Sequence, residues 1–248
     1  MSVRNFITPQ KKKPFCSAVI LAAGSGSRFG GDKIFAPLQG VPVLAYSLST
    51  FEACPLISEI IVVTAETKII QVSELCDKYN ITKAMKVLCG GETRLESALS
   101  GVSETDPKTK LIAIHDGARP LVTRKIITEA IRKAELNMAA VPAVPARDTV
   151  KLASGFQVTQ TPERDAVFNI QTPQVFVPEL IKGALTNALQ KELTIYDDAQ
   201  ALEILGVPIF LSSGSEENIK ITTPLDLMLA ETILNHRRER LVSAGKDR

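Results

Sequence analysis

Short apolar runs alternate with amphipathic segments along most of this 248-residue chain. Runs rich in β-branched residues, such as residues 57–64 and 111–115, predict buried strands. Between these runs, apolar residues recur at the spacing of one helix face, as in residues 42–51 and 95–102. Strand and helix alternate with no internal repeat, which predicts an α/β fold whose mostly parallel sheet carries helices on both faces.

The other predicted elements extend this Rossmann-like pattern. Thr123 and Thr223 each precede a helical pattern and suit the N-cap position, and Pro224 suits the first helical position. Further strands are predicted at residues 18–23, 86–89, 139–144 and 207–211, and further helices at residues 69–79, 126–134, 179–189 and 199–205.

Residues 145–174 interrupt the regular alternation of strand and helix. Residues 147–152 and 157–161 alternate polar and apolar positions around Ser154-Gly155, which predicts a β-hairpin with little core of its own. An isolated hairpin is marginal in water, so we expect a protruding β-arm that packs on a second subunit in a homodimer. The expected organisation is a disordered basic tail (1–14), a single domain (15–240) with the arm (145–174) as a subdomain, and a C-terminal tail (241–248).

The first predicted strand breaks into a glycine-rich loop that ends at Lys33. Backbone N–H groups in such a loop form an anion site, and Arg28 and Lys33 add two cations, which favours a triphosphate ligand. Phe29 stands where the dinucleotide fingerprint needs a glycine, and the Gly-Lys-Ser/Thr of a Walker A loop is missing. The structural alternative is a strand-to-helix turn with two solvated cations.

Composition narrows the function classes. The 29 basic and 27 acidic residues give a net charge of +2, and the chain has no tryptophan, so nucleic-acid binding is not expected. Four cysteines outside any Cys-x-x-Cys pair and two histidines make a zinc site unexpected. Neither a signal-peptide core nor a membrane span is evident, so we expect a cytoplasmic protein without a membrane partner.

Several short motifs, taken in order, resemble those of the 2-C-methyl-D-erythritol 4-phosphate cytidylyltransferases, a family of sugar-phosphate nucleotidyltransferases. The motifs are Ala-Ala-Gly-x-Gly-x-Arg, Gly-Gly-x-x-Arg-x-x-Ser, His-Asp-x-Ala-Arg-Pro, Asp-Thr-x-Lys, Thr-Pro-Gln, Asp-Asp-Ala and Asn-Ile-Lys-Ile-Thr-x-Pro-x-Asp-Leu. They run from about Ala18 to Glu231, and their order and spacing make the resemblance specific. The resemblance implies transfer of CMP from CTP to 2-C-methyl-D-erythritol 4-phosphate, with release of pyrophosphate, in the non-mevalonate route to isoprenoid precursors.

The same resemblance implies roles for individual residues. The catalytic cations would be Arg28, Lys33 and Lys220. Nucleotide contacts would come from Ala22, Ala23 and Gly24 around the triphosphate and from Gly91, Glu92 and Ser97 at the cytosine edge. Acceptor contacts would come from Asp116, Arg119, Thr149, Arg164 and Thr172. Thr149 and Arg164 would reach in from the arm of the partner subunit, and Asp116 would also hold Mg²⁺.

The reaction that the resemblance implies suits these residue types. The acceptor phosphate is already an anionic nucleophile, so the transfer needs alignment and charge neutralisation rather than a general base. Mg²⁺ uses one or two carboxylates at most, and Asp116 is suited to that role. Three features depart from the family pattern: the turn before Lys33 is shorter than in many relatives, Ile34-Phe35 stands where a polar-aromatic pair is common, and Glu92 replaces a frequent aspartate.

Other interpretations remain open on the sequence. A pentitol-phosphate cytidylyltransferase acting on ribitol 5-phosphate would share the fold, CTP and the mechanism. A Rossmann oxidoreductase and a non-catalytic nucleotide-binding module are remoter classes. Individually, Lys220 and Arg164 could be surface charges, and His115 reads as a structural residue rather than a base. Asp197 and Asp198 read as the cap of the following helix rather than as metal ligands.

Overall fold

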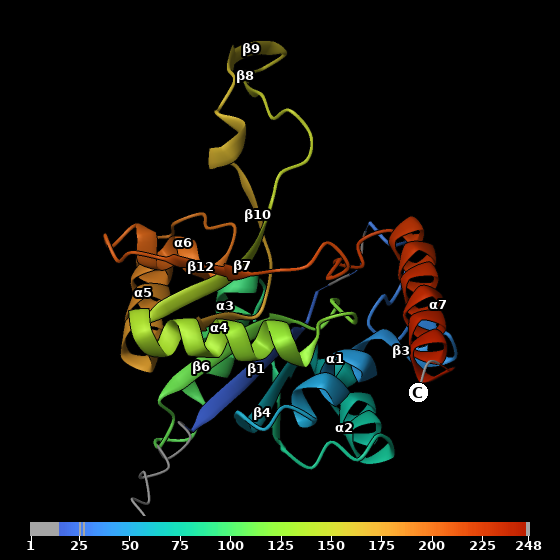
Figure 1. The fold of residues 1–248 in the computed structure, drawn as a ribbon. Helices are drawn as coiled ribbons and strands as arrows, with labels where there is room; N and C mark the ends of the chain where they lie inside the picture. Colours follow the sequence, from blue (N-terminus) through green and yellow to red (C-terminus); the bar gives the residue numbers. More distant parts are fainter. Residues whose placement is uncertain (1–14, 25, 27, 247–248) are drawn as a thin grey trace, which may run out of the picture.

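An eight-stranded sheet runs through the centre of the computed structural model, which describes residues 15–24, 26 and 28–246 (Figure 1). The strand order is β10-β7-β11-β6-β1-β4-β5, and β12 pairs with β7. All neighbouring pairs are parallel except those made by β10 and β11. The strands are β1 (Cys16–Ala22), β4 (Ile57–Thr64), β5 (Ala84–Cys89), β6 (Leu111–Asp116), β7 (Ala139–Pro145), β10 (Phe168–Ile170), β11 (Gln174–Phe176) and β12 (Phe210–Ser213).

Helices cover both faces of this sheet, so the predicted fold class is confirmed. One face packs on α1 (Val43–Glu52), α2 (Ile69–Lys78) and α4 (Arg124–Asn137), and the other on α3 (Arg94–Ser103), α5 (Pro178–Gln190) and α6 (Asp198–Glu203). Because successive side chains of a strand point to opposite faces of the sheet, each strand contributes residues to both of these helix-covered layers. Ile20 and Val62 belong to the first layer, whereas Val19 and Val63 belong to the second.

The closing helix α7 (Pro224–Lys246) packs beside the sheet, in red in Figure 1. Leu38, Ile221 and Ala230 form a small separate core there, next to the short hairpin of β2 (Pro37–Leu38) and β3 (Val41–Pro42). The predicted tail from residue 241 is helical as far as Lys246. Near the basic end of α7, Arg237 and Arg240 both pair with Glu217, at 2.7 and 2.9 Å.

Residues between β7 and β10 form an arm that extends away from the sheet (Figure 1). Its tip is the antiparallel hairpin of β8 (Leu152–Ser154) and β9 (Gln157–Gln160), and both strands are exposed throughout. A 3-10 turn, η2 (Arg164–Ala166), follows on the returning segment. The predicted hairpin is thus present, while its role in dimerisation stays a prediction.

The return of the arm is the part of the topology that periodicity did not predict. β10 and β11 run antiparallel to β7, and β11 also pairs with β6, so the chain re-enters the middle of the sheet. The last strand begins later than predicted, at Phe210. The expected tail at residues 1–14 lies outside the described residues. Across the part of the chain that the structure describes, no helix combines the length and apolarity needed to cross a membrane.

Candidate active site

A pocket of about 360 Å³ opens at the carboxyl end of the parallel strands, where ligands bind in sheets of this kind. The end of β1 and the glycine-rich loop form one wall, the start of α3 forms another, and Asp116 at the end of β6 forms the floor. Of the predicted site residues, those that line it are Ala22, Ala23, Gly24, Lys33, Gly91, Glu92, Ser97, Asp116 and Lys220. The other lining residues are Leu21, Ile34, Thr93, Arg94 and Ala118.

The Gly90-Gly91 turn makes a narrow slot between β5 and α3. A Cβ at Gly90 would lie 2.7 Å from Cβ of Ala23 and 2.7 Å from Oγ of Ser97, so only glycine fits. Thr93 then caps α3 in a capping box with Glu96, whose side chain accepts a hydrogen bond from the Thr93 backbone N–H at 2.7 Å. The slot is therefore built from closely approaching backbone and a rigid helix start.

Asp116 is the centre of a group of cations. Its Oδ2 lies 2.8 Å from Nζ of Lys220 and 3.7 Å from Nε of Arg119, and its Oδ1 lies 3.6 Å from Nε of Arg94. Burial alone would raise the pKa of Asp116, but Lys220, Arg94 and Arg119 hold it well below its usual range. Asp116 is therefore ionised over the whole physiological pH range.

Arg94 is held in the pocket wall by a second carboxylate. Its two terminal nitrogens donate to the two oxygens of Asp198, at 2.8 and 2.7 Å, and Asp198 is fully buried. Burial opposes the charge of Arg94, but Asp198 and Asp116 together raise its pKa. Gln174 fixes the start of α6 by donating to Asp197 at 2.7 Å and accepting from the Ala199 N–H at 3.0 Å.

Sequence reasoning assigned no role to Arg94, although Arg94 lies within the motif Gly-Gly-x-x-Arg-x-x-Ser. Arg94 could have been predicted as a pocket residue, because it stands two residues beyond Glu92, at the start of the predicted helix that became α3. Asp197 is the expected cap of α6, accepting from the Gln200 N–H at 2.9 Å. Asp198, by contrast, pairs with Arg94 from the other side of the pocket wall.

Two buried groups support Asp116 from below. Oγ1 of Thr172 accepts a hydrogen bond from the Asp116 N–H at 3.1 Å and lies 3.0 Å from Nδ1 of His115. Thr172 is 4% exposed and His115 is fully buried, so neither lines the pocket. Burial lowers the pKa of His115 to about 3, which keeps its imidazole neutral at physiological pH. The structural interpretation of His115 agrees with this placement.

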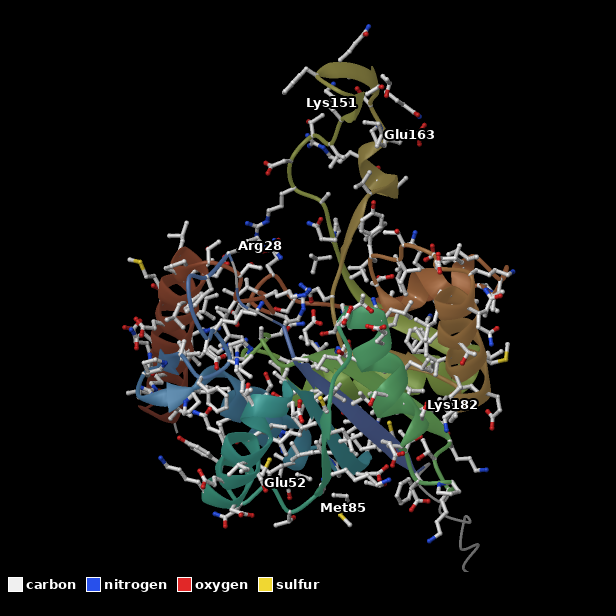
Figure 2. The ribbon with its side chains drawn as sticks, turned by 180° about the vertical axis from the view of Figure 1, so that it is seen from behind. Arg28, Glu52, Met85, Lys151, Glu163 and Lys182 are labelled. Atoms are coloured by element: carbon white, nitrogen blue, oxygen red, sulfur yellow. The ribbon has the colours of Figure 1, made fainter. Side chains whose placement is uncertain are left out.

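The glycine-rich loop presents Lys33 to the pocket. Burial, together with the positive charges of Lys220 and Arg28, lowers the pKa of Lys33. Arg28 itself is exposed and does not line the pocket. In Figure 2 it lies on the side of the molecule from which the arm rises. The Gly26 carbonyl accepts from the N–H groups of Phe29 and Gly30, at 2.8 and 3.2 Å, and so forms a tight turn beside Arg28.

The remaining predicted residues lie outside this pocket. Arg119 lines a neighbouring cavity of about 320 Å³ at the base of the arm, and its terminal nitrogen donates to the Asn218 carbonyl at 2.8 Å. Thr149 and Arg164 lie together on the arm, joined by a 3.3 Å hydrogen bond, and line a separate cleft there. Within one chain, therefore, the arm pair is not part of the pocket around Asp116.

The donor set fits a magnesium ion that arrives with a phosphate ligand. Among the residues that the structure describes, no three His, Cys, Asp or Glu side chains gather into a ready-made metal cage. Oδ1 of Asp116 is 3.6 Å from Arg94, beyond hydrogen-bond reach, so this oxygen can serve a further cation. One carboxylate oxygen, to which phosphate oxygens and waters are added, is a typical Mg²⁺ environment.

The electrostatics of the pocket favour a highly charged anion. Lys33, Arg94 and Lys220 line it and Arg119 lies against its floor, whereas Asp116, Glu92 and Asp198, the partner of Arg94, compensate part but not all of this positive charge. The N-terminus of α3 adds backbone donors on the same side. Such a pocket can hold a polyphosphate and neutralise charge that develops on phosphorus.

Comparisons with known proteins agree on one family. The family description "IspD: 2-C-methyl-D-erythritol 4-phosphate cytidylyltransferase" matches residues 16–236. Proteins named 2-C-methyl-D-erythritol 4-phosphate cytidylyltransferase from Caldanaerobacter subterraneus and Dehalococcoides mccartyi are 44% and 43% identical to this chain. The matches cover 88% and 89% of this chain and 98% and 96% of those proteins.

Solved structures give the same result. The 4-diphosphocytidyl-2C-methyl-D-erythritol synthase of Anaerococcus prevotii is 31% identical, with a TM-score of 0.81 and coverage of 90% of this chain and 97% of that one. The 2-C-methyl-D-erythritol 4-phosphate cytidylyltransferase of Thermus thermophilus is 30% identical, with a TM-score of 0.71. The match covers 88% of this chain and 98% of that chain.

Proposed function

This chain belongs to the 2-C-methyl-D-erythritol 4-phosphate cytidylyltransferase family, and we propose that it transfers CMP from CTP to 2-C-methyl-D-erythritol 4-phosphate. The products are 4-diphosphocytidyl-2-C-methyl-D-erythritol and pyrophosphate. The observation that carries the proposal is the cation group around Asp116, which lies beside the narrow Gly90-Gly91 slot. This combination suits a pyrimidine base and a triphosphate in one pocket.

The acceptor phosphate attacks the α-phosphorus of CTP in line with the departing pyrophosphate. Because the nucleophile is already anionic, no side chain has to remove a proton. Lys33 and Lys220 line the pocket where negative charge spreads in the transition state, and Arg28 assists from the loop. Ala22, Ala23 and Gly24 supply backbone to the triphosphate, while Gly91, Glu92 and Ser97 read the cytosine edge.

In this scheme Asp116 would hold a magnesium ion through its Oδ1. A bound magnesium ion would supply neutralisation of phosphate oxygens and alignment of the triphosphate. Lys220 stays on the other oxygen of the same carboxylate, at 2.8 Å, so its position is fixed independently of the metal. Arg119 holds Asp116 from the side of the neighbouring cavity, where the polyol phosphate would enter, and Thr172 holds the Asp116 N–H from beneath.

The acceptor site is completed by a second copy of the chain. Thr149 and Arg164 lie on the exposed arm, away from the pocket of their own subunit. A twofold dimer would place each arm at the pocket of its partner and would give two equivalent sites. There, Arg164 would bind the acceptor phosphate with its planar guanidinium, a geometry that lysine does not provide.

Release of pyrophosphate from CTP, measured with a panel of acceptor phosphates, tests the proposal. We expect turnover with 2-C-methyl-D-erythritol 4-phosphate to exceed turnover with ribitol 5-phosphate, and CTP to exceed ATP and GTP by a wide margin. A preference for ribitol 5-phosphate would change the proposed acceptor but leave the proposed cytidylyl transfer in place. Comparable turnover with a purine triphosphate would contradict the assignment of the Gly90-Gly91 slot to a pyrimidine.

A further inference from the structure

An ion pair joins the glycine-rich loop to the turn that follows the neighbouring strand β4. Nζ of Lys68 lies 2.7 Å from Oδ2 of Asp32, and the two side chains are 23% and 34% exposed. Asp32 directly precedes Lys33 in the chain. Lys68 ends the 3-10 turn η1 (Glu66–Lys68), which follows β4, and β4 pairs in parallel with β1. The pair therefore links the loop after β1 to the turn after β4 at the pocket edge of the sheet.

Gly30 and Gly31 have no side chain that could anchor the loop just before Asp32. A Cβ at either position would meet no atom within 4 Å, and the close contact of this stretch is made by backbone, because the Gly31 carbonyl oxygen lies against Gly26. On the other side of Lys33, Ile34 is 2% exposed and its carbonyl accepts from the Leu44 N–H at 2.9 Å. Lys33 thus has a well-packed residue after it and the Asp32–Lys68 ion pair before it.

We propose that the Asp32–Lys68 ion pair positions Lys33 for phosphoryl chemistry, an inference that rests on the proposed function. The pair limits the paths that the backbone at Lys33 can take across the mouth of the pocket. A displacement of about 1 Å in a reacting or stabilising group is enough to lower a rate substantially. Neither partner lines the pocket, so both act through Lys33 rather than on the nucleotide.

The ion pair also determines which group the Asp32 carboxylate contacts. With Lys68 present, the Asp32 carboxylate is occupied by a residue outside the pocket. Without Lys68, the carboxylate next to Lys33 would be free to pair with Lys33 or to repel a triphosphate. Loss of Lys68 alone should therefore be at least as harmful as loss of both partners. A lysine that binds the nucleotide directly would not show this dependence on Asp32.

The test compares Asp32→Asn, Lys68→Met, Lys68→Arg and the double variant Asp32→Asn/Lys68→Met in the full chain. The measurements are kcat and KM for CTP, equilibrium binding of CTP, and the thermal unfolding midpoint. Lys86→Met is the matched control, because Lys86 pairs with Glu104 at 2.8 Å on an exposed surface outside the pocket. Lys68→Arg keeps the charge and tests whether the ion pair, rather than the fold, is responsible.

Lys68→Met is expected to lower kcat about tenfold, with a smaller change in KM and in the unfolding midpoint. The double variant should be no worse than Lys68→Met, and Lys68→Arg should recover most of kcat. Near-wild-type kcat in Lys68→Met, or losses that multiply in the double variant, would overturn this inference while wild-type turnover still supports the proposed function. Absence of CTP turnover in the wild type would instead overturn both.

Discussion

Arg94 and Asp198 form a two-pronged ion pair that joins the first turn of α3 to the first turn of α6. The pair forms part of the pocket wall, and Arg94 also faces Asp116 at 3.6 Å. A buried carboxylate that loses its only ionic partner is costly, whereas a well-packed apolar pair in its place is tolerated. This difference makes the pair open to a direct stability test.

Arg94→Met should lower the free energy of unfolding by about 3–5 kcal/mol, because Asp198 would stay buried without its partner. The double variant Arg94→Met/Asp198→Leu should recover most of that loss. Urea unfolding measures both values. Arg240→Met is the control, since the exposed Arg240–Glu217 pair should contribute about 1 kcal/mol or less. Equal losses in the single and double variants would contradict the ion-pair explanation.

Lys33→Ala and Lys220→Ala should each reduce kcat by about 10²–10³-fold, the usual loss for one donor to a charged transition state. The fall in kcat should be much larger than the fall in stability. Steady-state pyrophosphate release and thermal unfolding together test this expectation. Lys125→Ala serves as the control, because the Lys125 side chain is 82% exposed and lies outside the pocket. A variant with near-wild-type kcat would remove that lysine from the catalytic set.

Gly90→Ala should abolish tight CTP binding, because its Cβ would lie 2.7 Å from both Ala23 and Ser97. Gly183→Ala offers a matched comparison within α5, where a Cβ would meet nothing within 4 Å. That second change should leave CTP binding unaltered and stabilise the helix by about 0.5–1 kcal/mol. Calorimetric titration with CTP distinguishes the two variants, and unchanged affinity in Gly90→Ala would argue against the slot.

Protein stability should decrease as the pH falls below about 6.5, the ordinary pKa of histidine. Burial lowers the pKa of His115 to about 3, so between these values the unfolded chain binds a proton that the folded chain does not. This group alone gives a slope of up to about 1.4 kcal/mol per pH unit. Asp116 does not interfere over most of this range, because its depressed pKa keeps its own contribution nearly constant above about pH 5.

Urea unfolding of metal-free protein between pH 7.5 and 4.5 would measure this slope. His115→Gln should flatten the profile even if it lowers stability at every pH, because glutamine does not titrate. Identical slopes in the two proteins would show that His115 is protonated in the folded state or does not control acid stability.

Mixing two inactive variants, Lys33→Ala and Arg164→Ala, should restore activity if the arm serves the partner subunit. After subunit exchange, each heterodimer has one site with both lesions and one site with neither, so it should have about half the wild-type activity. Pyrophosphate release from purified heterodimer measures the recovery. Two Arg164→Ala preparations mixed together provide the control. No recovery in a proven heterodimer would place Arg164 in its own subunit's site or in none.

The sequence predicted the fold class because helix and strand periods were clear along the parallel part of the sheet. It did not predict β10 and β11, because three-residue strands carry too little periodicity to distinguish them from loop. β11 reaches the middle of the sheet through its register with β6 and β7, which is a long-range property.

The pocket residues that could be predicted from the sequence are those in the loops that follow predicted strands. Gly91 and Asp116 closely follow predicted strands, Lys33 ends the loop that follows the first predicted strand, and the structure brings the three together. Arg94 and Asp198 are separated by 104 positions, so no local pattern could pair them. Thr172 was expected to touch the acceptor, whereas the structure places its hydroxyl beneath Asp116; its proposed contact with the acceptor stays untested.

The arm leaves and re-enters the sheet at two positions that face each other. Phe168 of β10 lies opposite Pro145 of β7 in an antiparallel ladder. A short turn could therefore replace everything between them without disturbing the strands that carry the nucleotide pocket. The arm is an exchangeable insertion: its length and sequence can change among descendants of this chain independently of the machinery that handles the triphosphate. Selection for a different acceptor or a different oligomer could thus act on the arm while the nucleotide site stays as it is.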